Sequence, residues 1–267
     1  MKSLNLTRHE LFLGKKNLLT WTLIIAGLMI MFVSTTTLII DNAEMAELIE
    51  GFPQALLDSF NINVESFTTF EGWMASEPYV FFVLLLASFA IALASTSISR
   101  EIDQGTGEFL FVTPHSRRNI FWSKAGADFL QISFVFLIGT AVTFAVGSTI
   151  VSITNPTGLF LVFLSAYLTA LATAGIGYVL SCLIDNQRTA LALGVGFVLL
   201  SFLFKSLAGM GGILSNLAKL SIFQLFDLFA ILDNHALSFS SLATSLGIYI
   251  IGLVVGSEIL ARKNLNL

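Results

Sequence analysis

The residue types that could do chemistry gather in one polar stretch, EIDQGTGEFLFVTPHSRRNIFWSK, at positions 101–124 between two apolar runs. Gly105 permits a tight turn, because glycine tolerates a positive φ that other residues avoid. Thr106 can then cap a short helix over residues 107–112, and Pro114 would stop that helix. The stretch is therefore predicted to hold a short helix between two turns.

The second half of the stretch places positive charge where a helix disfavours it. Ser116 can cap the next helix, which leaves Arg117 and Arg118 in a first turn whose dipole repels cations. We expect acidic groups to compensate them, either lipid phosphates or an acidic surface on a cytoplasmic partner. Exposed aromatic residues on the short helix, Phe109 and Phe111, suggest insertion into a protein groove. A docking element explains both features.

Motifs for nucleotide hydrolysis and for metal binding are incomplete. The run FLGKKN contains Gly14 and Lys15, but it lacks the upstream glycine and the hydroxyl residue of a phosphate-binding loop. His9 and Glu10 begin like a zinc-protease motif, but Leu13 stands where a second histidine would be needed. We therefore expect no ATPase, no metal and no cofactor in this chain.

The composition indicates an integral membrane protein. Hydrophobic residues make up 55% of the 267 residues and charged residues only 11%, against about 25% charge in soluble domains. The net charge of −4 provides no basic field for nucleic acid, so none is expected as a partner. The single cysteine, Cys182, lies in an apolar segment and is interpreted as a packing residue.

Six apolar runs are long enough to cross the bilayer as helices, which needs about 20 residues each. They are roughly Leu18 to Ile40, Pro78 to Ile98, Ala125 to Val151, Leu159 to Ile184, Thr189 to Ala208 and Ser241 to Ala261. The fold is thus predicted to be all-α, a polytopic membrane protein with one membrane domain over 1–267.

The distribution of basic residues predicts the orientation, because cytoplasmic connections retain Lys and Arg. With six spans, eleven bases fall on one side: Lys2, Arg8, Lys15, Lys16, Arg100, Arg117, Arg118, Lys124, Arg188, Arg262 and Lys263. Only Lys205 and Lys219 fall on the other. We therefore expect a multi-pass protein of the plasma membrane with both termini cytoplasmic.

The connections between the spans have distinct characters. Residues 1–17 mix apolar and charged residues, which suits a helix lying in the membrane interface. Residues 41–77 form an outer loop with eight acids and no base. Either this loop is an acidic vestibule, or it lacks bases simply because Lys and Arg are retained on the cytoplasmic side. Residues 99–124 form a cytoplasmic coupling loop, and 209–239 a re-entrant outer hairpin of short helices.

Polar residues inside the spans are few. In the fourth span Ser165, Thr169, Thr173 and Gly177 recur every four residues, which favours close helix packing, with a pathway lining as the alternative. Asp128 follows Lys124 by one turn and is interpreted as an i, i+4 ion pair, with gating as the alternative. Neither the stripe in the fourth span nor Asp128 supplies the chain of charged residues that a self-powered transporter would need to relay protons or ions.

The docking stretch resembles a known family signature. The run Glu101, Gly105, Thr106, Glu108, Leu110, Pro114, Ser116, Arg117 and Lys124 is similar to the pattern E…GT.e.LL..P.SR……K of type 2 permeases, the membrane subunits of ATP-binding-cassette (ABC) exporters. The runs FPQALLDSFNI, FEGW and the closing ARKNLNL are also similar to one branch of that family. Phe109 or Phe111 replaces the second leucine of the pattern, which leaves the docking register open.

The resemblance implies a half-size subunit that pairs with a second copy or a related permease. It also implies two copies of a separate ABC ATPase, which bind ATP and Mg²⁺, and outward transport by alternating access. The implied ATPase-docking positions are Glu101, Gly105, Thr106, Glu108, Phe109, Pro114, Arg117 and Lys124. The alternatives are a self-standing secondary transporter or channel, and a membrane sensor or scaffold that recruits a cytoplasmic partner.

Overall fold

The computed structural model describes residues 2–40, 51–53, 69–105, 116–207 and 216–263, and the side chains from residue 6 onward. Six helices in this part of the chain are long and apolar enough to cross a membrane, which confirms the predicted all-α class and span number. They are α1 (Lys2–Ser34), α6 (Glu77–Thr96), α9 (Arg117–Ile150), α10 (Pro156–Leu183), α11 (Gln187–Ser206) and α14 (Phe239–Arg262). The shorter elements are α2 (Thr36–Ile39), α5 (Phe70–Ala75), α7 (Ser99–Asp103), the 3-10 helix η3 (Ile222–Gln224) and α13 (Leu228–Asn234).

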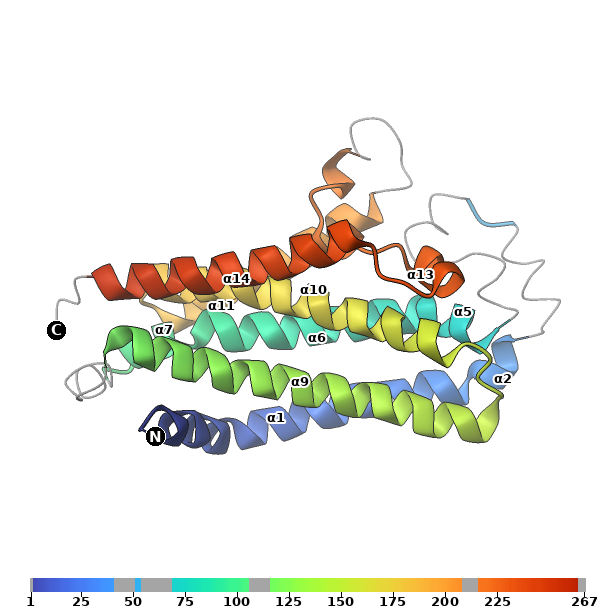
Figure 1. Cartoon of the computed structure of the whole chain (residues 1–267), viewed down its shortest axis with the longest axis horizontal. Coiled ribbons are helices and arrows are strands. Elements are labelled where there is room, and N and C mark those ends of the chain that lie inside the picture. The colour runs from blue at the N-terminus through green and yellow to red at the C-terminus, as the bar shows by residue number, and fades with distance from the viewer. Residues whose placement is uncertain (1, 41–50, 54–68, 106–115, 208–215, 264–267) are drawn as a thin grey trace.

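The six long helices run side by side along the long axis of the molecule (Figure 1). The beginning of α1, α7, the beginning of α9 and the end of α14 lie together; we call this the α7 end. The helices α2, α5 and α13 lie at the opposite end, the α5 end. An even number of spans therefore returns the chain to the end where it begins.

Helices α6 and α10 form the centre of the bundle. In the most apolar 18-residue stretch of each helix, 61% of α6 and 72% of α10 is buried inside the protein. Helix α1 packs along α9, α14 packs along α10, and α11 packs on α6. Glycine allows the closest of these approaches, since a Cβ on Gly252 of α14 would lie 2.1 Å from the carbonyl oxygen of Gly175 in α10. Small residues thus set the spacing between α14 and α10, as in other membrane bundles.

The N-terminal segment is helical, but its helix is continuous with the first span. Residues 2–34 form one uninterrupted helix, so the predicted helix over 1–17 continues directly into that span. No proline interrupts the segment, and Gly14 stays helical beside the side chain of Gln131. The Thr7 hydroxyl also donates to the carbonyl of Ser123 at 3.1 Å, which holds this part of α1 against α9.

The predicted coupling loop at 99–124 is largely helical where the structure describes it. Helix α7 occupies its first residues, and α9 already begins at Arg117 rather than at Ala125. The predicted cap at Ser116 is confirmed, because its hydroxyl accepts a hydrogen bond from the backbone N–H of Asn119 at 3.2 Å. The connection between these two helices spans residues 104–116, and its positions 106–115, with the predicted short helix, lie outside the described residues.

The outer loop 41–77 also contains more structure than predicted in its last part. Residues 70–75 form α5, whose Phe70, Trp73 and Met74 are buried against the bundle. Glu71, one of the eight acids, is buried and accepts a 2.6 Å hydrogen bond from the backbone N–H of Asn155. This acid caps a neighbouring turn instead of facing an open vestibule, while positions 41–50 and 54–68 lie outside the described residues.

The predicted hairpin at 209–239 contains η3 and α13, so short helices do separate the fifth and sixth spans. Asn155 fastens α13 to the bundle, because its amide donates to the carbonyl of Leu232 at 3.0 Å. Positions 209–215 of the hairpin lie outside the described residues. The described part supports the expectation of short helices there.

Candidate functional site

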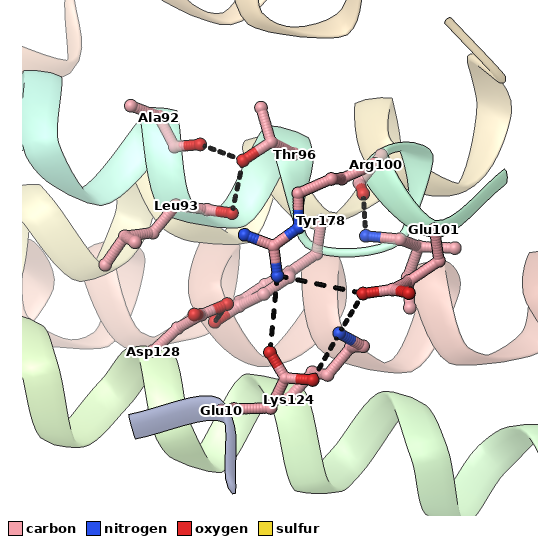
Figure 2. A network of polar contacts seen from close by, with 11 residues as sticks. Glu10, Ala92, Leu93, Thr96, Arg100, Glu101, Lys124, Asp128 and Tyr178 are labelled. Atoms are coloured by element: carbon pink, nitrogen blue, oxygen red, sulfur yellow. Dashed lines mark hydrogen bonds and ion pairs between the residues drawn. The ribbon is translucent and has the colours of Figure 1, made fainter. Parts of the chain in front are cut away.

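Four ionised side chains from three helices meet at the α7 end (Figure 2). The Lys124 ammonium of α9 lies 2.7 Å from Glu10 Oε1 of α1 and 2.9 Å from Glu101 Oε1 of α7. Arg100 of α7 adds a contact of 3.3 Å to Glu10 Oε2 and one of 3.7 Å to Glu101 Oε1. We call these four residues the ionic network. It joins the two helices that flank the loop 104–116 to each other and to α1.

Burial makes the ionic network stronger than a surface pair. The Lys124 side chain is 2% exposed, and those of Glu10 and Glu101 are 12% and 16% exposed. Charges withdrawn from water interact through a lower effective dielectric, and an unpaired one is strongly disfavoured. The ammonium of Lys124 therefore needs both carboxylates in place.

Hydrogen bonds to α10 position α7 and its two network residues. The Ser181 hydroxyl accepts from the backbone N–H of Ile98 at 2.7 Å and from that of Ser99 at 3.2 Å. These N–H groups lie at the start of α7, where no helical carbonyl is available to them. The junction of α6 and α7 is thereby fixed to α10, which directs Glu101 toward Lys124.

Gly105 ends α7 with the backbone conformation that the sequence predicts. Its φ is +70°, and its N–H donates to the carbonyl of Ile102 at 3.2 Å. This left-handed conformation is unfavourable for side chains with a branched Cβ. Four predicted docking residues follow directly and lie outside the described residues: Thr106, Glu108, Phe109 and Pro114.

The two arginines at the start of α9 are compensated from within the chain. Arg118 pairs with Glu258 of α14 at 2.7 Å, and Glu258 also binds Arg262 at 2.6 Å. Arg117 donates to the backbone carbonyl of Lys263, just beyond the end of α14. The compensating acid for Arg118 is thus Glu258, where we expected lipid phosphates or a partner. Of the predicted docking residues, Glu101 and Lys124 meet, whereas Arg117 contacts another part of the α7 end.

The predicted i, i+4 ion pair between Lys124 and Asp128 is not formed. Lys124 turns instead toward Glu10 and Glu101. Asp128 is buried, and its carboxylate accepts from the Tyr178 hydroxyl of α10 at 3.4 Å and from Ser97. The pairing failed as a prediction because two carboxylates from other helices lie closer to the ammonium.

Two members of the ionic network, Glu10 and Arg100, are not among the predicted docking residues. The sequence marks Glu10 as part of an incomplete zinc motif and of the mixed segment 1–17, and Arg100 as one of the cytoplasmic bases. The available signal for Glu10 is a single acid on a helix face whose other residues, among them Leu6, Leu13 and Gly14, are uncharged, which indicates a partner where another helix packs over it.

The small and polar residues of the fourth span lie in the interface between α10 and α6. Ser165 shares a 2.9 Å hydrogen bond with the Tyr79 hydroxyl of α6. Thr169 and Thr173 are buried, and their hydroxyls donate to carbonyls within α10. A Cβ on Gly177 would lie 2.7 Å from the Cβ of Ala94.

A cavity of about 330 Å³ opens beside the ionic network. Its walls come from α1, α6, α7, α9 and α11, and they include Asp128 and Gln131. Among the residues that the structure describes, no group of three or more His, Cys, Asp or Glu side chains could hold a metal ion.

Six long apolar helices, with an ionic network at one end of the bundle, define a multi-pass helical membrane protein. The sequence profile of the ABC-2 family transporter proteins matches residues 8–261, and the chain belongs to this family. It is an ABC-2 membrane permease domain, which has no ATPase activity of its own. No curated protein matches the chain.

Proposed function

We propose that the chain is the permease subunit of an ABC exporter, which moves its substrate outward by alternating access while a separate subunit hydrolyses ATP. Family membership supports the class of transporter, and the resemblance of residues 101–124 to the exporter signature supports the direction. The alternatives, a transporter or channel working alone and a scaffold, have no comparable support.

The observation that carries the proposal is the position of the ionic network at the base of the loop 104–116. Glu101 and Lys124 lie on the two helices that flank this loop, and their contact of 2.9 Å joins them directly. Glu10 extends the connection to α1. A displacement of the loop by a bound ATPase would therefore move α1, α7 and α9 as a unit.

The geometry supports two kinds of role for the docking residues. The buried Lys124 and the partly buried Glu101 are anchors that hold the ends of the loop, and Gly105 shapes its first turn. We propose that the ATPase itself is contacted by the residues between them, namely Thr106, Glu108, Phe109 and Pro114. Arg117 would join α9 to the end of α14 and so align the loop with the last span.

We further propose that the α7 end faces the cytoplasm, with both termini there, in the plasma membrane. The excess of basic residues in the connections at this end supports this orientation. The α5 end, with the hairpin at 209–239, would then face outward. Two ATPase copies and a second permease complete the complex, and the whole chain acts as one membrane domain.

We propose that the stripe Ser165, Thr169, Thr173 and Gly177 is a packing face rather than a pathway lining. Its hydroxyls are hydrogen-bonded and its surface is covered by α6 in a single copy of the chain. A pathway would need polar groups that remain accessible to substrate.

Purification of the affinity-tagged chain from its native membranes in a mild detergent tests the proposal. An ABC ATPase should co-purify, and ATP hydrolysis should belong to that subunit alone. Hydrolysis should increase when both subunits are placed in nanodiscs. Purified chain that transports a substrate with no ATPase present would contradict the proposal and favour a transporter that works alone.

A further inference from the structure

The beginning of α1 carries exposed bases on the side that faces away from the bundle. This helix lies at the edge of the bundle, where it packs along α9 and touches α6 (Figure 1). The side chains of Arg8, Lys15 and Lys16 are exposed and make no ion pair or hydrogen bond with any residue that the structure describes. Glu10, the only acid among the first 40 residues, is held in the ionic network by Lys124. No acid of α1 therefore neutralises these three bases.

Exposed apolar residues adjoin the bases on the same face of α1. Phe12 comes three and four positions before the two lysines, and Leu19 comes four and three positions after them, so these side chains form one continuous patch. Phe12 is 63% exposed and Leu19 56%. The Lys15 ammonium lies 3.9 Å from the centre of the Phe12 ring, a cation–π contact. We call the exposed residues of this patch the basic face of α1: Arg8, Phe12, Lys15, Lys16 and Leu19.

Helix α9 indicates that the basic face of α1 lies at the membrane interface. The Thr7 hydroxyl donates to the carbonyl of Ser123 at 3.1 Å, and the neighbouring Trp122 is 48% exposed. Tryptophan is enriched where the headgroups meet the hydrocarbon core. Beyond Trp122, the next exposed large apolar residue of α9 is Phe129. Both helices begin at the α7 end, so Phe129 lies within about one helical turn of the level of Lys15. The bases of α1 thus lie where α9 passes from the headgroups into the hydrocarbon.

We propose that the basic face of α1 binds an anionic phospholipid of the leaflet at the α7 end. The phosphate would lie between the ammonium groups of Lys15 and Lys16, and one acyl chain would run along Leu19 and the 71% exposed Leu23. Bases next to a span attract anionic headgroups, whereas the choline group of a zwitterionic lipid would bring a positive charge close to the lysines. Arg8, about 10 Å before Lys15 along the helix axis, adds positive potential at the headgroup.

The apolar part of the basic face favours a lipid over other phosphates. Phe12 and Leu19 are both more than half exposed. A soluble phosphate would leave them uncovered, whereas the glycerol and acyl groups of a phospholipid would cover them. The assignment concerns this chain alone, and it requires neither the ATPase nor the proposed direction of transport.

Native mass spectrometry of the full chain, released from detergent, tests the assignment with phosphatidylglycerol and phosphatidylcholine of identical acyl chains. The first phosphatidylglycerol should bind at least about tenfold more tightly than the first phosphatidylcholine, because each base near an anionic headgroup strengthens binding severalfold. The double variant Lys15→Gln, Lys16→Gln should lose at least about tenfold in phosphatidylglycerol affinity, and Arg8→Gln severalfold. The control Arg188→Gln, Arg262→Gln removes two exposed bases at the same end and has the same net charge as the lysine variant. It should bind phosphatidylglycerol within about twofold of the wild type.

Equal affinity for the two lipids would overturn the assignment, and so would unchanged phosphatidylglycerol binding by the folded lysine variant. An equal loss in both double variants would indicate attraction by net charge alone and would also overturn it. Displacement of the lipid by millimolar inorganic phosphate would assign the face to soluble phosphate instead. Loss of self-association in size-exclusion chromatography, with lipid affinity unchanged, would assign it to a second copy of the chain. If the lysine variant does not fold, the comparison of the two lipids and Arg8→Gln decide the question.

Discussion

Replacement of Lys124 by methionine should destabilise the α7 end severely. The substitution removes the ammonium but keeps a long apolar side chain, so it leaves the carboxylates of Glu10 and Glu101 facing each other at 12% and 16% exposure. Removal of one partner from a buried ion pair costs about 3–5 kcal/mol. Arg100 stays 3.3 Å from Glu10 and offsets part of this loss. We therefore expect a loss of about 3 kcal/mol, the lower limit of that range.

Thermal unfolding in detergent, followed by the fraction of monodisperse protein, measures this effect. At about 2–4 °C per kcal/mol for a chain of this size, the expected decrease in melting temperature is roughly 6–12 °C. The exposed pair of Arg262 and Glu258 provides a control, because Arg262 is 80% exposed and Arg262→Met should shift the melting temperature far less.

A charge-balanced double variant separates lost charge pairing from lost packing. Glu101→Gln and Lys124→Met together remove one charge of each sign and leave the pair of Arg100 and Glu10, so this protein should recover at least half of the stability lost by Lys124→Met alone. The reasoning is refuted if Lys124→Met unfolds within about 1 °C of the wild type, or if the double variant is no more stable than the single one.

Four further changes have defined outcomes. Gly105→Val should leave the protein folded but release its ATPase in a pull-down, because φ is +70° there and a β-branched residue resists that conformation; normal retention would contradict this. Gly252→Ala should lower the melting temperature, since its Cβ would lie 2.1 Å from the backbone of α10, whereas Gly247→Ala meets open space and should not. Thr173→Leu should reduce the yield of folded protein in size-exclusion chromatography, because the residue is fully buried; normal folding with altered substrate selectivity would favour the pathway instead. A cysteine at Asn264 should react with an impermeant maleimide only from the cytoplasmic side, and reaction from outside would reverse the proposed topology.

The parts of the fold that the sequence predicts well are those governed by local or one-dimensional signals. The six spans follow from continuous apolar runs, because the bilayer requires about 20 such residues for each helix. The cap at Ser116 and the positive φ at Gly105 follow from residue chemistry within one turn. Each of these features depends on neighbours in the sequence and needs no knowledge of which helices pack together.

The parts that escaped prediction depend on contacts between distant residues. Glu10 lies 114 positions from Lys124, and Arg118 lies 140 positions from Glu258, so no local pattern identifies either pair. The sequence instead favoured Asp128 for Lys124, because that pair satisfies helical spacing. The continuity of α1 has the same cause, since the Thr7 hydroxyl near its beginning bonds to Ser123 of α9, 116 positions away.

The most direct test of the central claim is the rate of ATP hydrolysis by the permease and its ATPase together in nanodiscs, for wild-type, Gly105→Val and Gly27→Val chains. Gly27 is a matched control, because it is helical and a Cβ there meets open space. We predict that wild-type and Gly27→Val chains stimulate their ATPase equally, while folded Gly105→Val does not. Equal stimulation by all three chains would contradict coupling through the loop 104–116.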